Sequence, residues 1–264
     1  MEQPKYQVLP YPRSRQAIVD YITVAQRKNI IHGLIEVDVT LPRQFIQERK
    51  ARTGEVLSFT AFIITCLARA IDENKVLHAY RAGRNRLIVY DEVDISTPIE
   101  RQVKGHRIGT PHVIRAANKM TFREIHQEIR TAQVEESGEF KRMDWYGLLP
   151  NFIGRLFWRF LGKYPHWRKR LMGTVGVTAV GMFGRGGGWG IPITDYTLQL
   201  SLGGIAEKPG INAGHIEARE YLSLTISMDH DVIDGAPAAR AAQRLKELIE
   251  AGYGLTEAIQ EPKT

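Results

Sequence analysis

The sequence predicts a single α/β domain in which a sheet is covered by helices. Segments with helical periodicity alternate along the chain with segments in which apolar and polar residues alternate strictly, as in strands. No low-complexity linker divides the 264 residues, of which 43% are hydrophobic and 25% are charged. A chain of this size and composition can bury a sizeable core without disulfides. We therefore expect residues 1–264 to form one domain.

Three helices are expected in the first half of the chain. Apolar residues recur at helical spacing over residues 12–28, 58–74 and 120–136. Ser58 stands where it can cap the second of these helices. Thr121 and Glu124 have the spacing of a capping box at the start of the third.

Strands are expected between and after these helices, over residues 33–41, 86–97, 109–117, 174–183, 197–206 and 222–228. A last helix begins after Gly235, has Pro237 in its first turn and ends near Gly252. The glycine-rich stretch "GRGGGWG" (184–190) lacks the Gly-Lys-Ser/Thr ending of a phosphate-binding loop, and no helix clearly follows it. We interpret it as a hairpin tip.

Composition excludes several classes of protein. The net charge of +7 suits an anionic partner, but the sequence has no zinc-finger spacing and no basic-region zipper, so we expect no nucleic-acid binding. Cys66 is the single cysteine, and the start of the chain has no apolar signal core, which favours a reducing, cytoplasmic location. The histidines outside the last strand show no metal-ligand spacing, and we expect no metal.

The turn "MDHDVIDGAPAAR" (228–240) concentrates ionisable residues between the last strand and the last helix. An imidazole can accept a proton near neutral pH if its orientation is fixed, and His230 directly follows a strand. Asp234 precedes Gly235, where a carboxylate can stabilise the turn. The alternative is an acidic turn that only caps the following helix.

This region resembles a known family. The segment "LSLTISMDHDVIDGAPAARAAQRLKELIE" is similar to the end of the catalytic domain of dihydrolipoamide acyltransferases, the core subunits of 2-oxoacid dehydrogenase complexes. Their pattern is a strand, Asp-His-Arg-x-x-Asp-Gly and an alanine-rich helix, and chloramphenicol acetyltransferase shares the shorter His-x-x-x-Asp-Gly motif. Further similar segments are "SRQAIVDYI", "SFTAFIITCLARAI" and "TVGVTAVGMFG". The resemblance covers roughly residues 12–138 and 174–250.

The resemblance implies a chloramphenicol acetyltransferase-like fold, a two-layer domain with a mixed sheet covered by helices. It also implies roles for individual residues. His230 matches the general base that takes a proton from an attacking thiol, and Thr178 matches the hydroxyl that stabilises the oxyanion. Asp234 matches an aspartate that supports the site together with an N-terminal arginine, for which Arg15 is the first candidate and Arg13 the second.

The substrates and partners are implied in the same way. We expect a coenzyme A-dependent acyltransferase that moves an acyl group between coenzyme A and a thiol or another small acceptor. The family forms trimers or multiples of trimers with active sites between subunits, so His230 and Thr178 would come from different chains. No lipoyl or subunit-binding domain is recognised before residue 12. We therefore expect no lipoyl group on this chain and an acyl carrier that arrives in trans.

Two positions depart from the family pattern. Asp231 stands where the family has an arginine after the histidine, and Ala179 stands where it has an asparagine after the Ser or Thr. A carboxylate beside the imidazole can raise the histidine pKa. These departures keep open a second hypothesis, a non-catalytic oligomeric scaffold that docks a partner or a membrane.

Residues 144–173 are expected to form a basic, aromatic insertion. This segment contains three of the four tryptophans and one acidic residue, Asp144, and its basic residues are Arg155, Arg159, Lys163, Arg168, Lys169 and Arg170. Apolar residues form a broad helical surface beside a basic stripe. Three interpretations remain open: a helix packed on the domain or on a neighbouring subunit, an interfacial helix on an anionic membrane, or a lid over the acyl channel.

Overall fold

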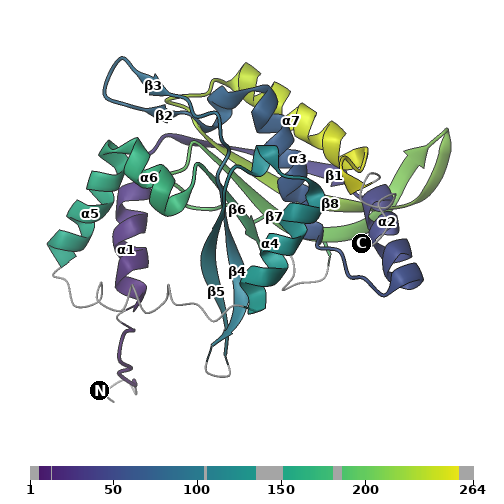
Figure 1. Cartoon of the computed structure of the whole chain (residues 1–264), viewed down its shortest axis with the longest axis horizontal. Coiled ribbons are helices and arrows are strands. Elements are labelled where there is room, and N and C mark those ends of the chain that lie inside the picture. Colours follow the sequence, from purple (N-terminus) through teal and green to yellow (C-terminus); the bar gives the residue numbers. More distant parts are fainter. Residues whose placement is uncertain (1–5, 13, 104–105, 135–150, 181–185, 256–264) are drawn as a thin grey trace, which may run out of the picture.

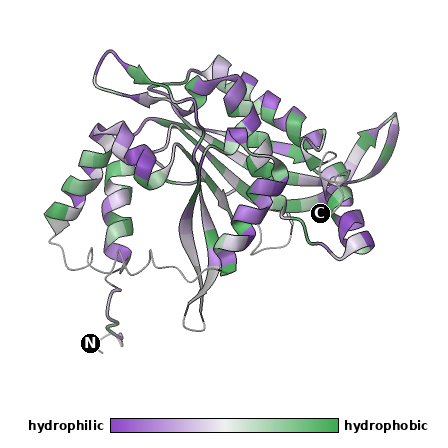
Figure 2. Cartoon of the chain, in the orientation of Figure 1, coloured by the Kyte–Doolittle hydropathy of each residue, from purple (hydrophilic) through white to green (hydrophobic). Residues whose placement is uncertain are grey.

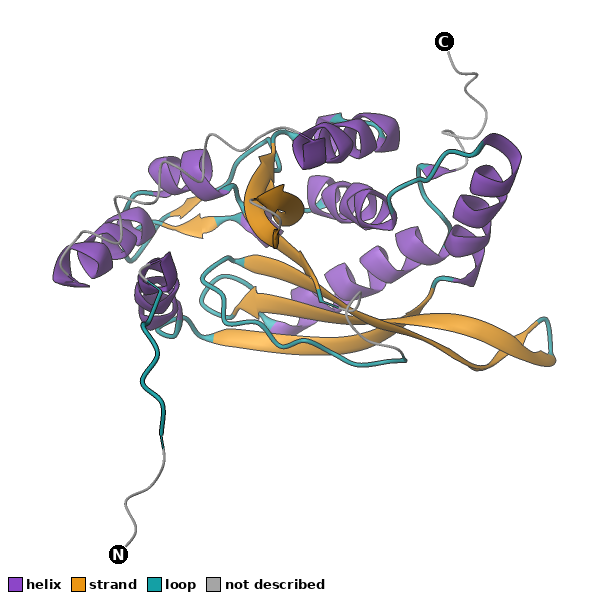
Figure 3. Cartoon of the chain, turned by 90° about the horizontal axis from the view of Figure 1, so that it is seen from below, coloured by secondary structure: helices purple, strands orange, loops and turns teal. Residues whose placement is uncertain are grey.

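A six-stranded mixed sheet forms one layer of the molecule, and helices form the other (Figures 1 and 3). The computed structural model describes residues 6–12, 14–103, 106–134, 151–180 and 186–255. The strand order is β1-β8-β7-β6-β4-β5, and β2 and β3 form a separate two-stranded ribbon. The strands are β1 (Ile30–Asp38), β2 (Tyr80–Arg81), β3 (Leu87–Ile88), β4 (Ile95–Val103), β5 (His106–Ile114), β6 (Val175–Ala179), β7 (Leu198–Asn212) and β8 (His215–Asp229).

The helices fall into two groups in space. One group covers a face of the sheet, and the other lies at one end of the molecule (Figures 1 and 3). The first group is α2 (Thr40–Thr53), α3 (Phe59–Glu73), α4 (Phe122–Val134) and α7 (Gly235–Glu250). The second is α1 (Ser14–Ala25), α5 (Asn151–Lys163) and α6 (Pro165–Met172); short 3-10 turns η1 (Lys75–His78) and η2 (Ala117–Lys119) complete the fold.

The core lies between the sheet and helices α3, α4 and α7. Strand residues point alternately to the two faces of a sheet, and Leu222, Leu224, Ile226 and Met228 of β8 all lie in the core cluster. Their partners on β7 include Leu198, Leu200 and Leu202. The amphipathic pattern of the sequence is therefore satisfied by burial of one strand face under three helices.

The opposite face of the same strands is polar, although much of it is also buried. Thr178 of β6 is paired with Ser201 of β7, and Ser201 is paired with Thr225 of β8, so three hydroxyls form a row across the sheet. The hydroxyls of Ser201 and Thr225 are buried and have no hydrogen-bond partner in the described part of the chain. Gly187 and Gly188 lie against this face, since the Gly188 amide donates to the Ser223 hydroxyl at 3.2 Å.

The predicted helix starts are confirmed. The Ser58 hydroxyl accepts a hydrogen bond from the Ala61 amide at 3.2 Å, as expected of an N-cap. The Thr121 amide donates to the Glu124 carboxylate at 2.6 Å, and the Glu124 amide donates back to the Thr121 hydroxyl at 3.3 Å. This reciprocal pair is the capping box that the sequence predicted.

Three details of the expected chain path are wrong. The strand expected over residues 86–97 is interrupted, because β3 ends at Ile88 and β4 begins at Ile95 in a different sheet. The stretch after β6 is not a hairpin tip, because β6 and β7 are paired in parallel and must be joined by a crossover. Its described glycines, from Gly186 on, pack instead against the backbone of β7, where Gly203 lies under the Gly188 carbonyl. Helix α2 was not expected, because only Pro42 and Arg49 are buried in it and no apolar stripe marks it.

Candidate active site

His230 is the first residue after β8 and lies at the C-terminal end of that strand. Asp229, the last residue of β8, pairs with Ile30 of β1. The His230 amide donates to the Asn29 carbonyl at 2.8 Å, which continues the pairing of the two strands by one residue. The imidazole is 48% exposed. The sheet thus fixes the backbone of His230 and leaves its ring accessible.

Asp234 lies beside the imidazole. Its Oδ1 is 3.8 Å from Nδ1 of His230, and its side chain is 85% exposed. Asp234 occupies the N-cap position of α7, but its side chain makes no capping hydrogen bond there. The carboxylate is therefore placed next to the histidine and does not serve the capping role that the sequence left open.

An ion pair with a buried carboxylate fixes the end of β8. The carboxylate of Asp229 is fully buried and accepts from the Lys28 ammonium at 2.5 Å. The same carboxylate accepts from the Asp231 amide at 3.1 Å, which holds the backbone on both sides of His230. A buried carboxylate needs such partners because it has lost its hydration. Asp229 thus rigidifies the turn that carries the base.

Asp231, the residue that departs from the family pattern, is bound to groups other than the imidazole. Its carboxylate accepts from the Asn29 side-chain amide at 2.9 Å and from the Arg81 guanidinium at 3.0 Å. The hydrogen bond from Asn29, with the positive charge of Arg81, lowers the pKa of Asp231 below its ordinary value. Arg81 belongs to the β2–β3 ribbon, 150 residues away in sequence. No local signal in the sequence links it to this turn.

Thr178 lies near the end of β6 and is partly buried. It does not meet His230 within one chain. Thr178 stands opposite Ser201, which stands opposite Thr225, five residues before His230. Two strand spacings make ~10 Å across the sheet, and five residues make ~17 Å along β8. A hydroxyl at that distance cannot share a reacting carbonyl with the same chain's imidazole.

The N-terminal arginines are not brought to Asp234 in the described structure. Arg15 lies exposed in α1, and no ion pair between it and Asp234 occurs among the described residues. Arg13 lies outside the described residues. The support that the turn does receive comes from Lys28, Asn29 and Arg81, which the sequence did not single out.

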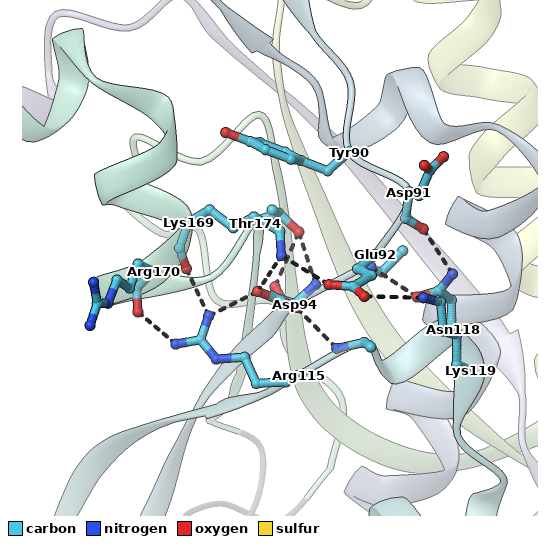
Figure 4. A network of polar contacts seen from close by, with 12 residues as sticks. Tyr90, Asp91, Glu92, Asp94, Arg115, Asn118, Lys119, Lys169, Arg170 and Thr174 are labelled. Atoms are coloured by element: carbon cyan, nitrogen blue, oxygen red, sulfur yellow. Dashed lines mark hydrogen bonds and ion pairs between the residues drawn. The ribbon is translucent and has the colours of Figure 1, made fainter.

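The strand that carries Thr178 is positioned by a polar network around Asp94 (Figure 4). The Asp94 carboxylate is buried and accepts from Arg115 at 2.8 Å and from Lys169 at 2.9 Å. Arg115 also donates to the carbonyl oxygens of Lys169 and Arg170 at the end of α6. The Thr174 amide, immediately before β6, donates to the Asp94 carbonyl at 2.7 Å. Asp94 therefore joins α6, β4, β5 and the start of β6.

Sequence comparison identifies a family for this chain. The family model described as 2-oxoacid dehydrogenases acyltransferase (catalytic domain) matches residues 3–146 and 171–256. The lipoamide acyltransferase component of the branched-chain alpha-keto acid dehydrogenase complex of Bacillus subtilis is 26% identical over 223 residues, which cover 82% of this chain and 46% of the relative. The chain thus spans about half the length of that relative.

Solved structures show the same fold. A probable dihydrolipoamide acetyltransferase from Listeria monocytogenes superposes with a TM-score of 0.68 at 23% identity and covers 98% of both chains. A chloramphenicol acetyltransferase superposes with a TM-score of 0.51 at 17% identity and covers 92% of this chain and 95% of that one. The predicted fold class and the predicted family are both confirmed. The match over most of its length shows that this chain belongs to the family of 2-oxoacid dehydrogenase acyltransferase catalytic domains.

Proposed function

We propose that this protein is an acyltransferase that moves an acyl group between coenzyme A and a thiol or another small acceptor, with His230 as the general base. The observation that carries the proposal is an accessible imidazole at the end of a buried, paired strand, with Asp234 on the Nδ1 side of its ring. Membership of the acyltransferase family supports the choice of reaction.

The proposed reaction follows from the two ring nitrogens. With Nδ1 on the side of Asp234, Nε2 faces the incoming thiol and takes its proton. The thiolate sulfur attacks the thioester carbonyl and forms a tetrahedral oxyanion. When the carbon–sulfur bond to coenzyme A breaks, the leaving thiolate takes the proton from Nε2. The acyl group is then on the acceptor, and His230 is neutral again.

The oxyanion donor comes from a second copy of the chain in this proposal. Thr178 lies too far from His230 of its own chain, so a complete site needs a neighbouring subunit that presents its own Thr178. A chain of similar fold, with a TM-score of 0.70 at 17% identity, forms the cubic core of the pyruvate dehydrogenase multienzyme complex. A homotrimer, alone or in a larger assembly, is the arrangement that we propose here.

The acceptor is a separate molecule or a carrier supplied by another protein. The Bacillus subtilis relative acts on lipoamide, as its name states. We propose that any lipoyl carrier reaches this chain in trans. A coenzyme A thioester is the donor that the family relationship supports, and the proposed chemistry needs no metal ion.

Replacing the proposed base tests the function. We expect His230→Ala to lower the rate of acyl transfer from acetyl-coenzyme A to dihydrolipoamide by about 100-fold or more, the usual scale for loss of a general base. The release of free coenzyme A can be followed with a thiol reagent. His215→Ala, at an exposed site in the β7–β8 turn region, is the matched control and should keep wild-type activity.

Two outcomes would contradict the proposal. Near-normal transfer by His230→Ala would remove the assignment of the base. A wild type that neither turns over nor binds a series of acyl-coenzyme A thioesters would favour the non-catalytic scaffold instead. Thermal shift with coenzyme A measures that binding separately from turnover.

A further inference from the structure

Within the described part of the chain, one face of helix α5 packs against α1. Trp158 packs edge-on against Tyr21 of α1 with ring centroids 5.1 Å apart, and Leu161 is 1% exposed. Arg155 reaches the buried carboxylate of Asp20 at 3.5 Å. Figures 1 and 3 both show α5 beside α1 at the end of the molecule. The inner face of α5 thus packs on α1, and the exposed Arg155 adds an ion pair to Asp20.

Helix α6 is held even more firmly. The Arg168 guanidinium is 3% exposed and forms two hydrogen bonds to Asp195, which is 8% exposed. Arg168 also lies over the rings of Tyr80 and Tyr196, at 5.3 and 4.9 Å from their centroids. The hydroxyl of Tyr21 donates to the same Asp195. This buried pair makes α6 part of the domain, which argues against the interpretation of the segment as a mobile lid.

The outward face of the two helices is apolar. The exposed large residues follow each other at helical spacing, and we call them the outer stripe: Phe152 (71% exposed), Leu156 (63%), Phe160 (44%), Trp167 (53%) and Leu171 (51%). Figure 2 shows green, hydrophobic positions along α5 at the edge of the molecule. Helices of soluble proteins normally turn such residues inward. Here the ion pair of Arg168 with Asp195 lies inside and the stripe lies outside.

Cations accompany the outer stripe on α5 and α6. Residues 151–172 contain no Asp or Glu. Arg159 and Lys163 lie seven and eleven residues after Phe152, on the same side of α5, and both are exposed. Arg170 lies 6.0 Å from the ring of Trp167 in α6. The surface is therefore apolar and positively charged, with aromatic rings of the kind that favour the boundary between lipid and water.

The common features of the family do not account for this surface. The family model matches up to residue 146 and from residue 171, so α5 and nearly all of α6 fall outside it. A two-fold contact between copies through the outer stripe would set the same cations against each other, and a contact with a different face of a neighbouring subunit is an outcome that the test below distinguishes. An anionic partner with an apolar interior complements both properties of the surface.

We propose that α5 and α6 dock the protein on the surface of a lipid bilayer that contains anionic headgroups. The outer stripe enters the boundary between headgroups and acyl chains, while Arg159, Lys163 and Arg170 contact lipid phosphates. No helix within the described ranges has the length and hydrophobicity to cross a bilayer, and the 13 residues of α5 extend only ~20 Å. The helices therefore lie on the membrane and do not span it.

Vesicle flotation tests this proposal with the full-length protein. We expect wild type to float with vesicles of phosphatidylcholine and phosphatidylglycerol, much less with phosphatidylcholine alone, and less as salt is added. Leu156→Glu with Phe160→Glu should weaken the partition by about tenfold or more, because two apolar anchors become anionic. Ile211→Glu with Ile216→Glu is the matched control, since these residues are 81% and 78% exposed on the β7–β8 ribbon.

A second double variant tests the proposal without replacing any apolar residue, so that a folding defect is not the cause of lost binding. Arg159→Gln with Lys163→Gln changes only exposed side chains and should lower binding to the anionic vesicles several-fold while acyl transfer is unchanged. Wild type that stays unbound, or stripe variants that float as well as wild type, would overturn the proposal. A change of sedimentation mass in the stripe variants without any vesicle binding would show that the surface is a subunit contact, and the membrane proposal would be wrong.

Discussion

The single residue that separates this chain from the family pattern at its proposed base is Asp231. Its negative charge is bound by Asn29 and by Arg81, whose guanidinium comes from the β2–β3 ribbon. A cation is therefore present in this region, although it is supplied from a distant part of the chain. The sequence alone suggested a carboxylate acting on the histidine, whereas the structure gives that carboxylate a role in holding the turn.

Exchange of the two charges tests this role. We expect Asp231→Ala to lower kcat several-fold with little change in KM. The turn that carries His230 then loses the hydrogen bond to Asn29 and the ion pair with Arg81. Arg81→Ala should act in the same direction. The double variant Arg81→Asp with Asp231→Arg should recover most of the activity, because it restores an ion pair with reversed polarity. A double variant as slow as the product of the two single effects would show that the pair does not act together.

Among the elements, the 3-10 turn η1 is joined to the strand of Thr178 by one buried histidine. His78 is fully buried; its Nε2 donates to the Tyr90 carbonyl at 3.0 Å, and Nδ1 lies 2.9 Å from the Thr174 hydroxyl. Burial lowers the pKa of His78 from 6.5 to about 4, an effect that Lys169 and Lys75 reinforce and Asp94 opposes. The imidazole of His78 is therefore neutral in the folded protein at neutral pH.

This histidine makes the stability of the fold depend on pH. The unfolded chain binds a proton at His78 near pH 6.5, and the folded chain does so only near pH 4. The free energy of unfolding should therefore fall by up to about 3 kcal/mol from this group as the pH drops from 6.5 to 4. Urea unfolding across this range should show a steeper loss for wild type than for His78→Asn. Equal slopes for the two proteins would contradict the assignment.

Local signals in the sequence predicted the elements that local chemistry determines. The caps of α3 and α4 and the period-two pattern of β8 needed only neighbouring residues, and all three are present. Helix α2 escaped prediction because it buries little apolar surface. The partners of Asp229 and Asp231 could not be predicted from the sequence. Contacts between distant segments, such as that of Arg81 with the turn, leave no periodic pattern in it.

For the whole molecule, the distance between Thr178 and His230 means that the proposed active site needs two subunits. Thr178 and His230 can therefore be replaced in separate chains that are then combined in one assembly. We expect Thr178→Ala to lose about 100- to 1000-fold in rate, the range for one oxyanion donor. Mixed assemblies of Thr178→Ala and His230→Ala chains, formed by co-expression, should regain about one quarter of wild-type activity, since random neighbours bring an intact pair together that often. Co-expressed chains as inactive as each variant alone would place both residues in one subunit's site.

The length of β7 and β8 gives the molecule a gradient of local stability. Towards their far ends, at Asn212 and His215, these strands pair only with each other, and most side chains there are exposed. From Tyr221 onward β8 also pairs with β1, and from Leu222 every residue up to Asp229 is buried. Opening of the distal ribbon therefore costs little, while the last amides of the same strand open only when the domain unfolds. His230 follows the buried end, so the proposed base is attached to a segment that is paired on both sides.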